Sequence, residues 1–288
     1  MTRWPIYNHV IFDFDSTLSA IEGIDVLASN AGVGDEVSEL TQLAMDGGID
    51  LEAVYQKRLT TIRPNRGEIR ALKEQYKKHL TEDAQEVIAA LTWLGHEVYI
   101  VSGGLLDPIA EIGGSLGIPL ENIEAVDIQY NELSGDWWLA QTDQFDSKQP
   151  YLKSDETGLK KTHGKAGVIR KLLAGKRGRR VLIGDGTSDL AASSAVDLFV
   201  GYTGTVQRER VAAFAPAILQ CRSLAPIVVL SAGLGVRKSL ACEKYQALME
   251  KAFYLIDQGM LRFNDAELDH RFNQAYRKML EEEGAIFR

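Results

Sequence analysis

The chain has 288 residues, of which 45% are hydrophobic and 25% are charged, a composition typical of a soluble globular protein with a substantial core. Its formal net charge of −8 argues against nucleic acid as the main partner, because nucleic-acid binding usually needs a basic face. The sequence has no apolar run of membrane-spanning length and no signal-peptide-like start. Its two cysteines, Cys221 and Cys242, have no metal or redox spacing, so we expect a cytoplasmic protein with reduced thiols.

The first predicted element is a buried strand at Val10-Ile11-Phe12, a run of β-branched and aromatic residues. Asp13 and Asp15 follow it directly, so they are expected at the carboxyl end of the strand, where α/β sheets place their ligand crevices. Two carboxylates at such a place are costly unless a cation compensates them. Taken alone, the segment also fits an exposed acidic turn in which Ser16 and Thr17 cap the next helix.

Three later segments bring polar and glycine-rich sequence next to apolar runs. A predicted strand at 97–101 leads into Ser102-Gly103-Gly104, and another at 181–183 leads into Gly184-Asp185-Gly186-Thr187-Ser188-Asp189. Between them, Lys165 stands just before an amphipathic stretch. We expect all of these segments to converge with Asp13 at one edge of a parallel sheet. Such a set of carboxylates, hydroxyl, ammonium and glycines suits a phosphate monoester and Mg²⁺.

In this order the four segments resemble the motifs of the haloacid dehalogenase superfamily of phosphatases, and within it the phosphoserine phosphatases. The motifs are DFDST, VSGG, HGK and GDGTSD, and the likeness extends through IEGID, AMDGG and KRL between the first two motifs. The resemblance implies an α/β fold with a Rossmann-like parallel sheet core, an inserted helical cap and a C-terminal helical extension. We expect the core at 1–18 and 83–230, the cap at 19–82 and the extension at 231–288.

The remaining segments are less informative. Residues 129–161 are irregular and polar around Trp137-Trp138, and the family usually has a β-hairpin here, which we expect to pack on the sheet rather than to contact a partner. The basic cluster Lys176–Arg180 is expected to be a solvated loop away from the catalytic edge. Helical periodicity covers 238–258 and 265–283. The apolar positions of these helices need a cover, and the sequence leaves open whether the core or the second subunit of a homodimer provides it.

The resemblance also implies catalytic roles. Asp13 would be the nucleophile that forms an aspartyl-phosphate, and Asp15 would be the general acid for the leaving oxygen and then the base for water. Ser102 and the amide of Gly103 would hold the phosphoryl oxygens, while Lys165 would lower the repulsion between phosphate and nucleophile. An alternative for the aspartate pair is that both bind Mg²⁺ without covalent chemistry.

Magnesium is the cofactor that the resemblance implies, because Mg²⁺ takes hard oxygen ligands. The candidate ligands are the Asp13 carboxylate, the Asp15 carbonyl oxygen and Asp185. Gly186 and Asp189 would support these ligands from behind. A plain negative charge at a helix N-terminus is the alternative interpretation of Asp189.

Substrate recognition is expected from the cap. Glu22 would bind an ammonium group of the substrate, and Arg58 would bind its carboxylate through a bidentate pair of hydrogen bonds. Met45 and Gly47 would shape the closing wall. Without the family resemblance these cap residues would not indicate a binding site, because each residue type is common on helices.

The leading hypothesis is therefore a Mg²⁺-dependent phosphatase for O-phospho-L-serine in serine biosynthesis. Leu51 stands where the family usually has Phe, and Asp46 stands where many members have Gly. These departures leave open a phosphatase or phosphotransferase of the same mechanism for another small phosphorylated metabolite. A non-catalytic scaffold protein is the hypothesis from another class, and the complete set of motif side chains argues against it.

Overall fold

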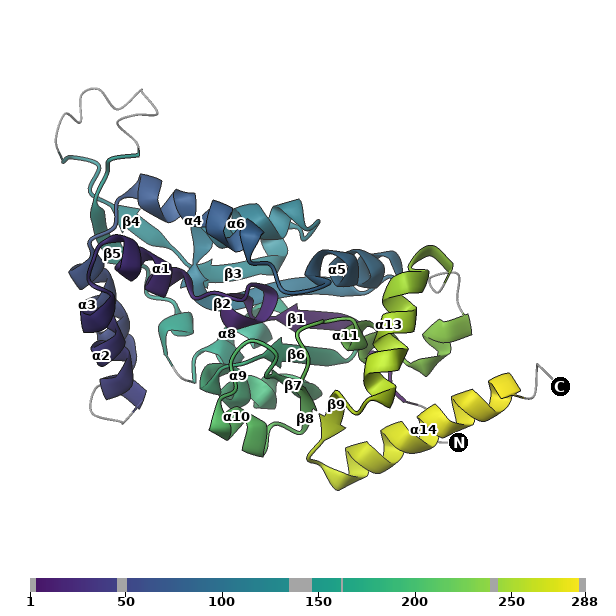
Figure 1. Ribbon diagram of the computed structural model, residues 1–288. Coiled ribbons are helices and arrows are strands. Elements are labelled where there is room, and N and C mark those ends of the chain that lie inside the picture. The colour runs from purple at the N-terminus through teal and green to yellow at the C-terminus, as the bar shows by residue number, and fades with distance from the viewer. Residues whose placement is uncertain (1–3, 46–50, 135–146, 162, 239–242, 285–288) are drawn as a thin grey trace.

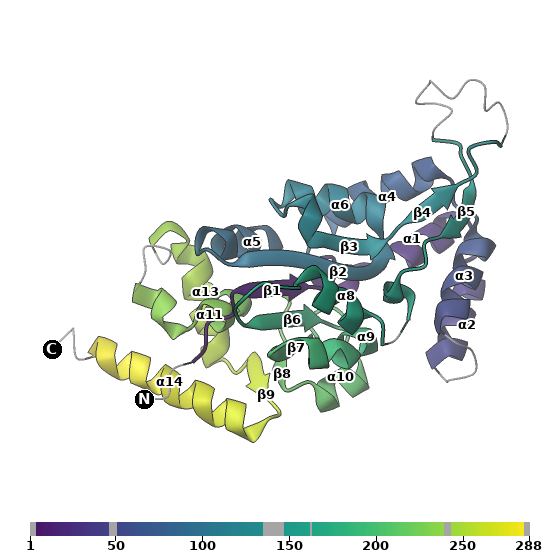
Figure 2. The same cartoon turned by 180° about the vertical axis from the view of Figure 1, so that it is seen from behind.

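A seven-stranded sheet with helices on both faces forms the body of the molecule (Figures 1 and 2). The computed structural model describes residues 4–45, 51–134, 147–161, 163–238 and 243–284. In spatial order, the strands are β3 (Ile123–Val126), β2 (Glu97–Leu105), β1 (His9–Phe12), β6 (Arg180–Gly184), β7 (Leu198–Tyr202), β8 (Ala217–Leu219) and β9 (Leu261–Phe263). The core helices are α5 (Ala84–Trp93), α6 (Leu106–Ser115), α8 (Lys165–Leu172), α9 (Thr187–Ala191), α10 (Glu209–Phe214) and α11 (Pro226–Ala232). This is the Rossmann-like α/β fold predicted from the sequence.

Strand β1 lies between β2 and β6 and runs parallel to both. All four of its residues are buried, as expected for a strand that is covered on both faces. Phe12 pairs with Ile100 on one side and with Ile183 on the other, and the amide of Asp13 donates to the Ile183 carbonyl at 2.8 Å. This register brings the ends of three strands to the same edge of the sheet.

Two motif segments differ in local structure from the prediction. Strand β2 continues to Leu105 instead of ending at Val101, and its pairing with β3 becomes irregular between these two residues. The Ser102-Gly103-Gly104 segment is therefore an irregular strand end. Lys165 begins helix α8 and does not follow a strand, so a helix delivers this side chain to the sheet edge.

Four helices form the insert between β1 and β2, namely α1 (Gly23–Asn30), α2 (Gly34–Met45), α3 (Leu51–Ile62) and α4 (Arg66–Lys78). The chain segments that enter and leave this insert run side by side, since Ser19 and Leu80 form an isolated β-bridge and the Ala20 amide donates to the His79 carbonyl. We refer to the insert as the cap. Two adjacent connections of this kind are suited to a hinge.

A β-hairpin of β4 (Ile128–Tyr130) and β5 (Tyr151–Ser154) forms a separate two-stranded sheet. It was expected to pack on the main sheet, but it forms hydrogen bonds to the cap and to Lys160 in the loop before Lys165. Gln56 of α3 donates to Ser154 at 2.7 Å and accepts from the Tyr151 hydroxyl at 2.7 Å. Trp137 and Trp138 lie outside the described residues.

The C-terminal part of the chain adds to the core. It contains a short helix at Leu234–Lys238, helix α13 (Gln246–Asp257), strand β9 and helix α14 (Ala266–Gly284). The expected extension was purely helical, whereas β9 joins the sheet antiparallel to β8. A strand this short carries too weak a pattern to be predicted from sequence.

An aromatic cluster fixes the C-terminal helices to the start of the chain. The Trp4 ring contacts the Phe263 ring at 5.5 Å and the Phe272 ring at 5.0 Å between centroids. In α13, Leu248 and Phe253 are buried as well. The chain itself covers these apolar positions, so they do not require a second subunit. Dimerisation through these helices stays a prediction.

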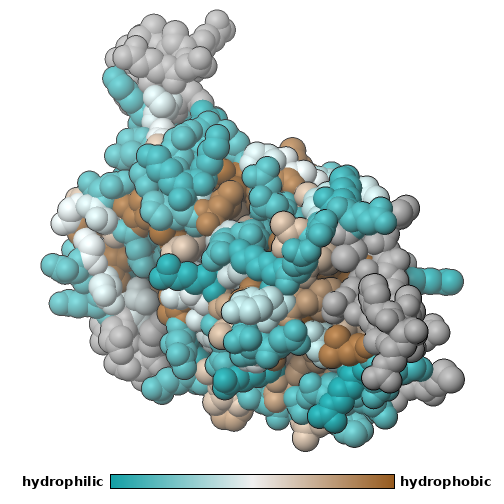
Figure 3. All heavy atoms as spheres, turned by 45° about the vertical axis from the view of Figure 1, so that its right-hand side comes forward, coloured by the Kyte–Doolittle hydropathy of each residue, from teal (hydrophilic) through white to brown (hydrophobic). Residues whose placement is uncertain are grey.

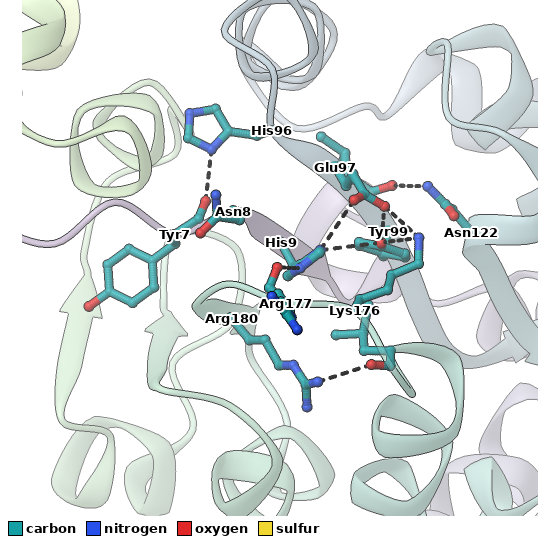
Figure 4. A network of polar contacts seen from close by, with 12 residues as sticks. Tyr7, Asn8, His9, His96, Glu97, Tyr99, Asn122, Lys176, Arg177 and Arg180 are labelled. Carbon is teal, nitrogen blue, oxygen red and sulfur yellow. Dashed lines mark hydrogen bonds and ion pairs between the residues drawn. The ribbon is translucent and has the colours of Figure 1, made fainter.

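Polar side chains form a network at the opposite end of the sheet, around the amino ends of β1, β2 and β6 (Figure 4). The buried His9 ring lies 3.0 Å from the Arg177 carbonyl through Nε2, and Lys176 donates to Glu97. Arg180 donates to the Leu173 carbonyl at 3.0 Å. The basic turn is thus far along β6 from Asp13, and most of its residues are exposed, in agreement with a solvated loop.

Polar residues cover most of the described surface on the face shown in Figure 3, with apolar residues in smaller areas between them. Within the described residues, none of the helices combines the length and the apolar character that a membrane span requires. Cys221 is a free thiol, while Cys242 lies outside the described residues.

If the C-terminal helices belong to the core, Phe272→Ala should lower the free energy of unfolding by about 3–5 kcal/mol, because it removes a ring that is 2% exposed. The matched control is Phe214→Ala, whose ring is 70% exposed and whose loss should change stability by about 0.5 kcal/mol or less. Urea unfolding measures both variants. Equal stabilities would mean that α14 does not contribute to the folded core.

Candidate active site

Four charged side chains meet at the carboxyl edge of the sheet. Lys165 Nζ lies 3.0 Å from Asp13 Oδ1 and 2.6 Å from Asp189 Oδ1. Asp185, one residue beyond β6, joins them, and Asp13, Asp185 and Asp189 each place a carboxylate oxygen within 4.8 Å of the others. All four side chains are buried. The edge thus holds three carboxylates against one ammonium.

The electrostatics of this cluster follow from burial and from its excess negative charge. Burial disfavours the Lys165 ammonium, but Asp13 and Asp189 outweigh that effect and raise the pKa of Lys165. Burial, together with the nearby Asp13, also raises the pKa of both Asp185 and Asp189. The lysine therefore stays charged, and the site favours additional positive charge.

Asp15 has a different environment from Asp13. Its side chain is half-buried, and Oδ1 accepts hydrogen bonds from the Tyr76 hydroxyl at 2.7 Å and the Gly23 amide at 3.3 Å. Burial, with the nearby Glu22 carboxylate, raises the pKa of Asp15 well above its ordinary value, although the Tyr76 hydrogen bond opposes this. A carboxyl with a raised pKa is suited to hold and deliver a proton near neutral pH.

Ser102 and its glycines form the wall beside Asp15. The Ser102 hydroxyl is buried and accepts a hydrogen bond from the Gly104 amide at 3.1 Å. A Cβ atom at Gly104 would lie 2.7 Å from Asp15 Oδ2, so any side chain here would displace the carboxylate. Gly104 is therefore needed for close approach. Gly103 is half-buried at the same strand end.

A tight turn at Phe14–Leu18 links the catalytic edge to the cap. Ser16 adopts a left-handed backbone with φ of 57°, which is uncommon for a residue other than glycine. This conformation places its hydroxyl 2.9 Å from Glu22 Oε1, to which it donates. Thr17 donates to Asp185 Oδ1 at 3.4 Å. The turn thereby connects the first motif both to the cap and to the fourth motif.

Arg208 is a site residue that the sequence analysis missed. Its Nε donates to Asp185 Oδ2 at 2.8 Å, and its Nη2 donates to Glu22 Oε1 at 3.1 Å. The guanidinium thus bridges core and cap. It stands after Gly204 in the loop that follows β7, the neighbour of β6, so the position of this loop at the same sheet edge was the available signal.

Helix α3 carries Arg58 into the cap wall. Arg58 Nε is buried and has no hydrogen-bond partner among the described residues, and its guanidinium carbon lies 5.7 Å from the centre of the Tyr55 ring. Near the start of the same helix, Glu52 pairs with Lys161 at 3.1 Å, which ties the helix to the loop before Lys165. Gly47 and the side chain of Met45 lie outside the described part of the chain, so their expected roles stay predictions.

The carboxylate cluster fits a hard divalent cation. Apart from the Lys165 ion pair, no hydrogen-bond donor among the described residues reaches Asp13 Oδ1, although this atom is buried. The two oxygens of Asp189 are already occupied, by Lys165 and by the Gly186 amide at 3.0 Å. Asp185 also accepts at both oxygens, from Thr17 and from Arg208, but Arg208 is partly exposed, whereas the Lys165 that holds Asp189 is fully buried. This difference favours Asp13 and Asp185 as direct ligands and Asp189 as a support.

The fold and the site define an α/β phosphohydrolase of the haloacid dehalogenase type. The structure of a haloacid dehalogenase family hydrolase from Salmonella enterica aligns with a TM-score of 0.66 at 16% identity, covering 79% of this chain and 72% of that one. A phosphoserine phosphohydrolase-like protein from Francisella tularensis aligns with a TM-score of 0.62 at 26% identity, covering 74% of this chain and 95% of that one. No protein-family model matches the chain.

Comparison with curated sequences identifies the family within this class. Over 207 residues the chain is 33% identical to the phosphoserine phosphatases of Bos taurus and Homo sapiens, covering 70% of this chain and 84% of each relative. The chloroplastic phosphoserine phosphatase of Arabidopsis thaliana is 33% identical over 213 residues, covering 73% of this chain and 68% of that one. The chain belongs to the phosphoserine phosphatase family.

Replacing Lys165 with Met should lower the free energy of unfolding at pH 7 by about 3–5 kcal/mol, because Asp13 and Asp189 would lose their shared buried counter-ion. Lys171→Met, on the exposed face of the same helix, is the control and should change stability by about 0.5 kcal/mol or less. Urea unfolding compares the two. A similar small effect in both variants would contradict the view that Lys165 neutralises the cluster.

Proposed function

We propose that the protein is a Mg²⁺-dependent phosphatase that hydrolyses O-phospho-L-serine through an aspartyl-phosphate, as the last step of serine biosynthesis. The observation that carries this proposal is the contrast between two aspartates on one turn. Asp13 lies 3.0 Å from a permanently charged, buried ammonium, while Asp15 has a raised pKa. Asp13 thus has a cation beside it, while the carboxyl group of Asp15 is suited to hold a proton.

In the first step, a carboxylate oxygen of Asp13 attacks phosphorus and forms a P–O bond, and the bond from phosphorus to the seryl oxygen breaks. Asp15 gives its proton to that oxygen, so serine leaves as the neutral alcohol. The Ser102 hydroxyl and the Gly103 amide hold the phosphoryl oxygens, and Lys165 balances the charge between nucleophile and phosphate.

In the second step, water attacks phosphorus and the bond from phosphorus to the Asp13 oxygen breaks. Asp15, now ionised, accepts a proton from this water and returns to its starting state. Inorganic phosphate leaves with the Asp13 carboxylate restored. The Tyr76 hydrogen bond keeps the Asp15 carboxyl oriented through both steps.

Asp13, Asp185 and the carbonyl oxygen of Asp15 would hold Mg²⁺, with Gly186 and Asp189 behind them. When bound, the ion supplies positive charge to the phosphoryl group. The close approach of three buried carboxylates supports this assignment, since Lys165 and Arg208 supply two positive charges for three carboxylates.

The cap would recognise the serine part of the substrate. Glu22 would pair with the ammonium group and Arg58 with the carboxylate. Because Glu22 Oε1 already accepts from Ser16 and Arg208, an incoming ammonium must share or replace these donors. This observation favours a second candidate, another small phosphate ester without an ammonium group, which would leave the Glu22–Arg208 pair intact.

The decisive measurement is phosphate release from a panel of small phosphomonoesters with and without Mg²⁺. We expect O-phosphoserine to lead by at least roughly tenfold in kcat/KM, about 1.4 kcal/mol of transition-state preference. Asp13→Asn should abolish turnover because it lacks the nucleophile, and chelation of Mg²⁺ should do the same.

Each alternative gives a distinct result in this panel. Preference for another ester would keep the chemistry and reject the serine assignment, and transfer of phosphate to added alcohols would indicate a phosphotransferase. Release of phosphate by Asp13→Asn at the wild-type rate would reject the aspartyl-phosphate mechanism.

Arg58→Ala should raise the KM for O-phosphoserine at least tenfold, while the KM for O-phosphoethanolamine, which has no carboxylate, should change less than about twofold. Arg63→Ala is the control, since Arg63 is an exposed arginine just after the same helix. Steady-state kinetics on both esters measure the effect. Equal losses for the two esters would argue against Arg58 as a carboxylate-binding residue.

A further inference from the structure

The hydroxyl of Tyr55 is a buried polar group without a described partner. The Tyr55 side chain is 3% exposed, and its oxygen makes no hydrogen bond to the described residues. Arg58 Nε, three residues further along α3, is unpartnered in the same way. Residues at this spacing lie on one face of a helix. Folded proteins satisfy the great majority of their buried polar groups, so two adjacent exceptions suggest donors that a ligand completes.

Helix α3 lies beside the active site. Its Glu52 pairs with Lys161, and in the same loop the carbonyl oxygen of Leu159 would lie 3.5 Å from a Cβ atom at Gly103. Burial raises the pKa of Tyr55, although the nearby Arg58 opposes this effect. Burial and the nearby Asp15 raise the pKa of Tyr76, and Tyr55 adds to this effect. The Tyr76 hydroxyl donates to Asp15. The Tyr55 hydroxyl therefore stays protonated on the cap side of the general acid, where it can donate a hydrogen bond to a substrate.

The chemistry of the neighbours selects which substrate group this is. The Arg58 guanidinium lies beside the Tyr55 ring, and its positive charge disfavours an ammonium and favours an anion. Phosphoryl oxygens already have Ser102, Gly103 and Lys165 as partners on the sheet edge. The substrate's carboxylate, in contrast, can accept several hydrogen bonds, and Arg58 is so far the single residue proposed to donate to it.

We propose that the Tyr55 hydroxyl is a specificity-determining donor that binds the carboxylate of the substrate together with Arg58. This inference rests on the proposed function and deepens it, because it concerns the carboxylate of phosphoserine. A tyrosine hydroxyl and a guanidinium on one helix face form a rigid two-residue receptor for a planar anion.

The surroundings of α3 hold this receptor in place. Gln56 is fixed by hydrogen bonds to Ser154 and Tyr151, and Glu52, one turn before Tyr55, is fixed by Lys161. These contacts come from the hairpin and from the loop before Lys165. Donors that are ordered before the substrate arrives bind it with a smaller entropic cost.

The test is Tyr55→Phe, which removes the hydroxyl and keeps the buried ring. We expect the KM for O-phosphoserine to rise about tenfold with kcat nearly unchanged, while both constants for O-phosphoethanolamine change less than about twofold. Calorimetric titration of O-phosphoserine into Asp13→Asn, with and without Tyr55→Phe, should show the same tenfold loss of affinity without turnover.

Tyr151→Phe is the matched control, since it removes a hydroxyl that holds the same helix through Gln56. If a variant only shifts helix α3, the kinetic constants for both esters should change to a similar degree. We expect this result for Tyr151→Phe. Equal effects of Tyr55→Phe on the two esters, or no effect on either, would overturn the inference about Tyr55. The proposed function would still hold in that case if the wild-type protein prefers O-phosphoserine. Wild-type preference for a non-carboxylated ester would overturn both.

Discussion

The structure depends on one electrostatic constraint, which is that three buried carboxylates share an edge of the sheet with a single buried ammonium. The register of β1 and β6 brings Asp13 and Asp185 to one edge, where Asp189 joins them, and Lys165 contacts Asp13 and Asp189 directly. Such a cluster costs free energy in a poorly solvated site unless cations compensate it. Lys165 and Arg208 supply two positive charges for the three carboxylates, so the edge is suited to a further cation.

The same charge distribution links the core to the cap. Arg208 pairs with Asp185 and with Glu22, so one guanidinium joins the proposed metal-binding side of the site to the proposed ammonium-binding side. The two connections of the cap run side by side at Ser19 and Leu80, and the hairpin is attached to the cap through Gln56. Apolar packing adds to these polar contacts, since the Tyr76 ring of the cap lies 4.8 Å from the Phe14 ring between centroids.

Sequence reasoning was effective where chemistry is local. A buried strand followed by acidic residues identified Asp13, Asp15 and Asp185, and the strand pattern predicted their common edge. It failed for residues whose role comes from distant partners. Tyr76 reaches Asp15 across 61 positions, and Arg208 reaches Glu22 across 186. Tyr76 lies in helix α4 and Arg208 in the loop after β7, and neither has a local signal that separates it from an ordinary surface residue.

The sequence by itself determined the α/β class, the order of the motifs and the types of side chain at the catalytic edge, because strand periodicity and residue chemistry are properties of short segments. Tertiary structure alone decided that β9 completes the sheet, that the hairpin binds the cap through Gln56, and that the buried Tyr55 hydroxyl has no partner among the described residues. These features arise from packing between segments far apart in the chain. The sequence pattern does not indicate which polar group will lack a hydrogen-bond partner once the chain has folded.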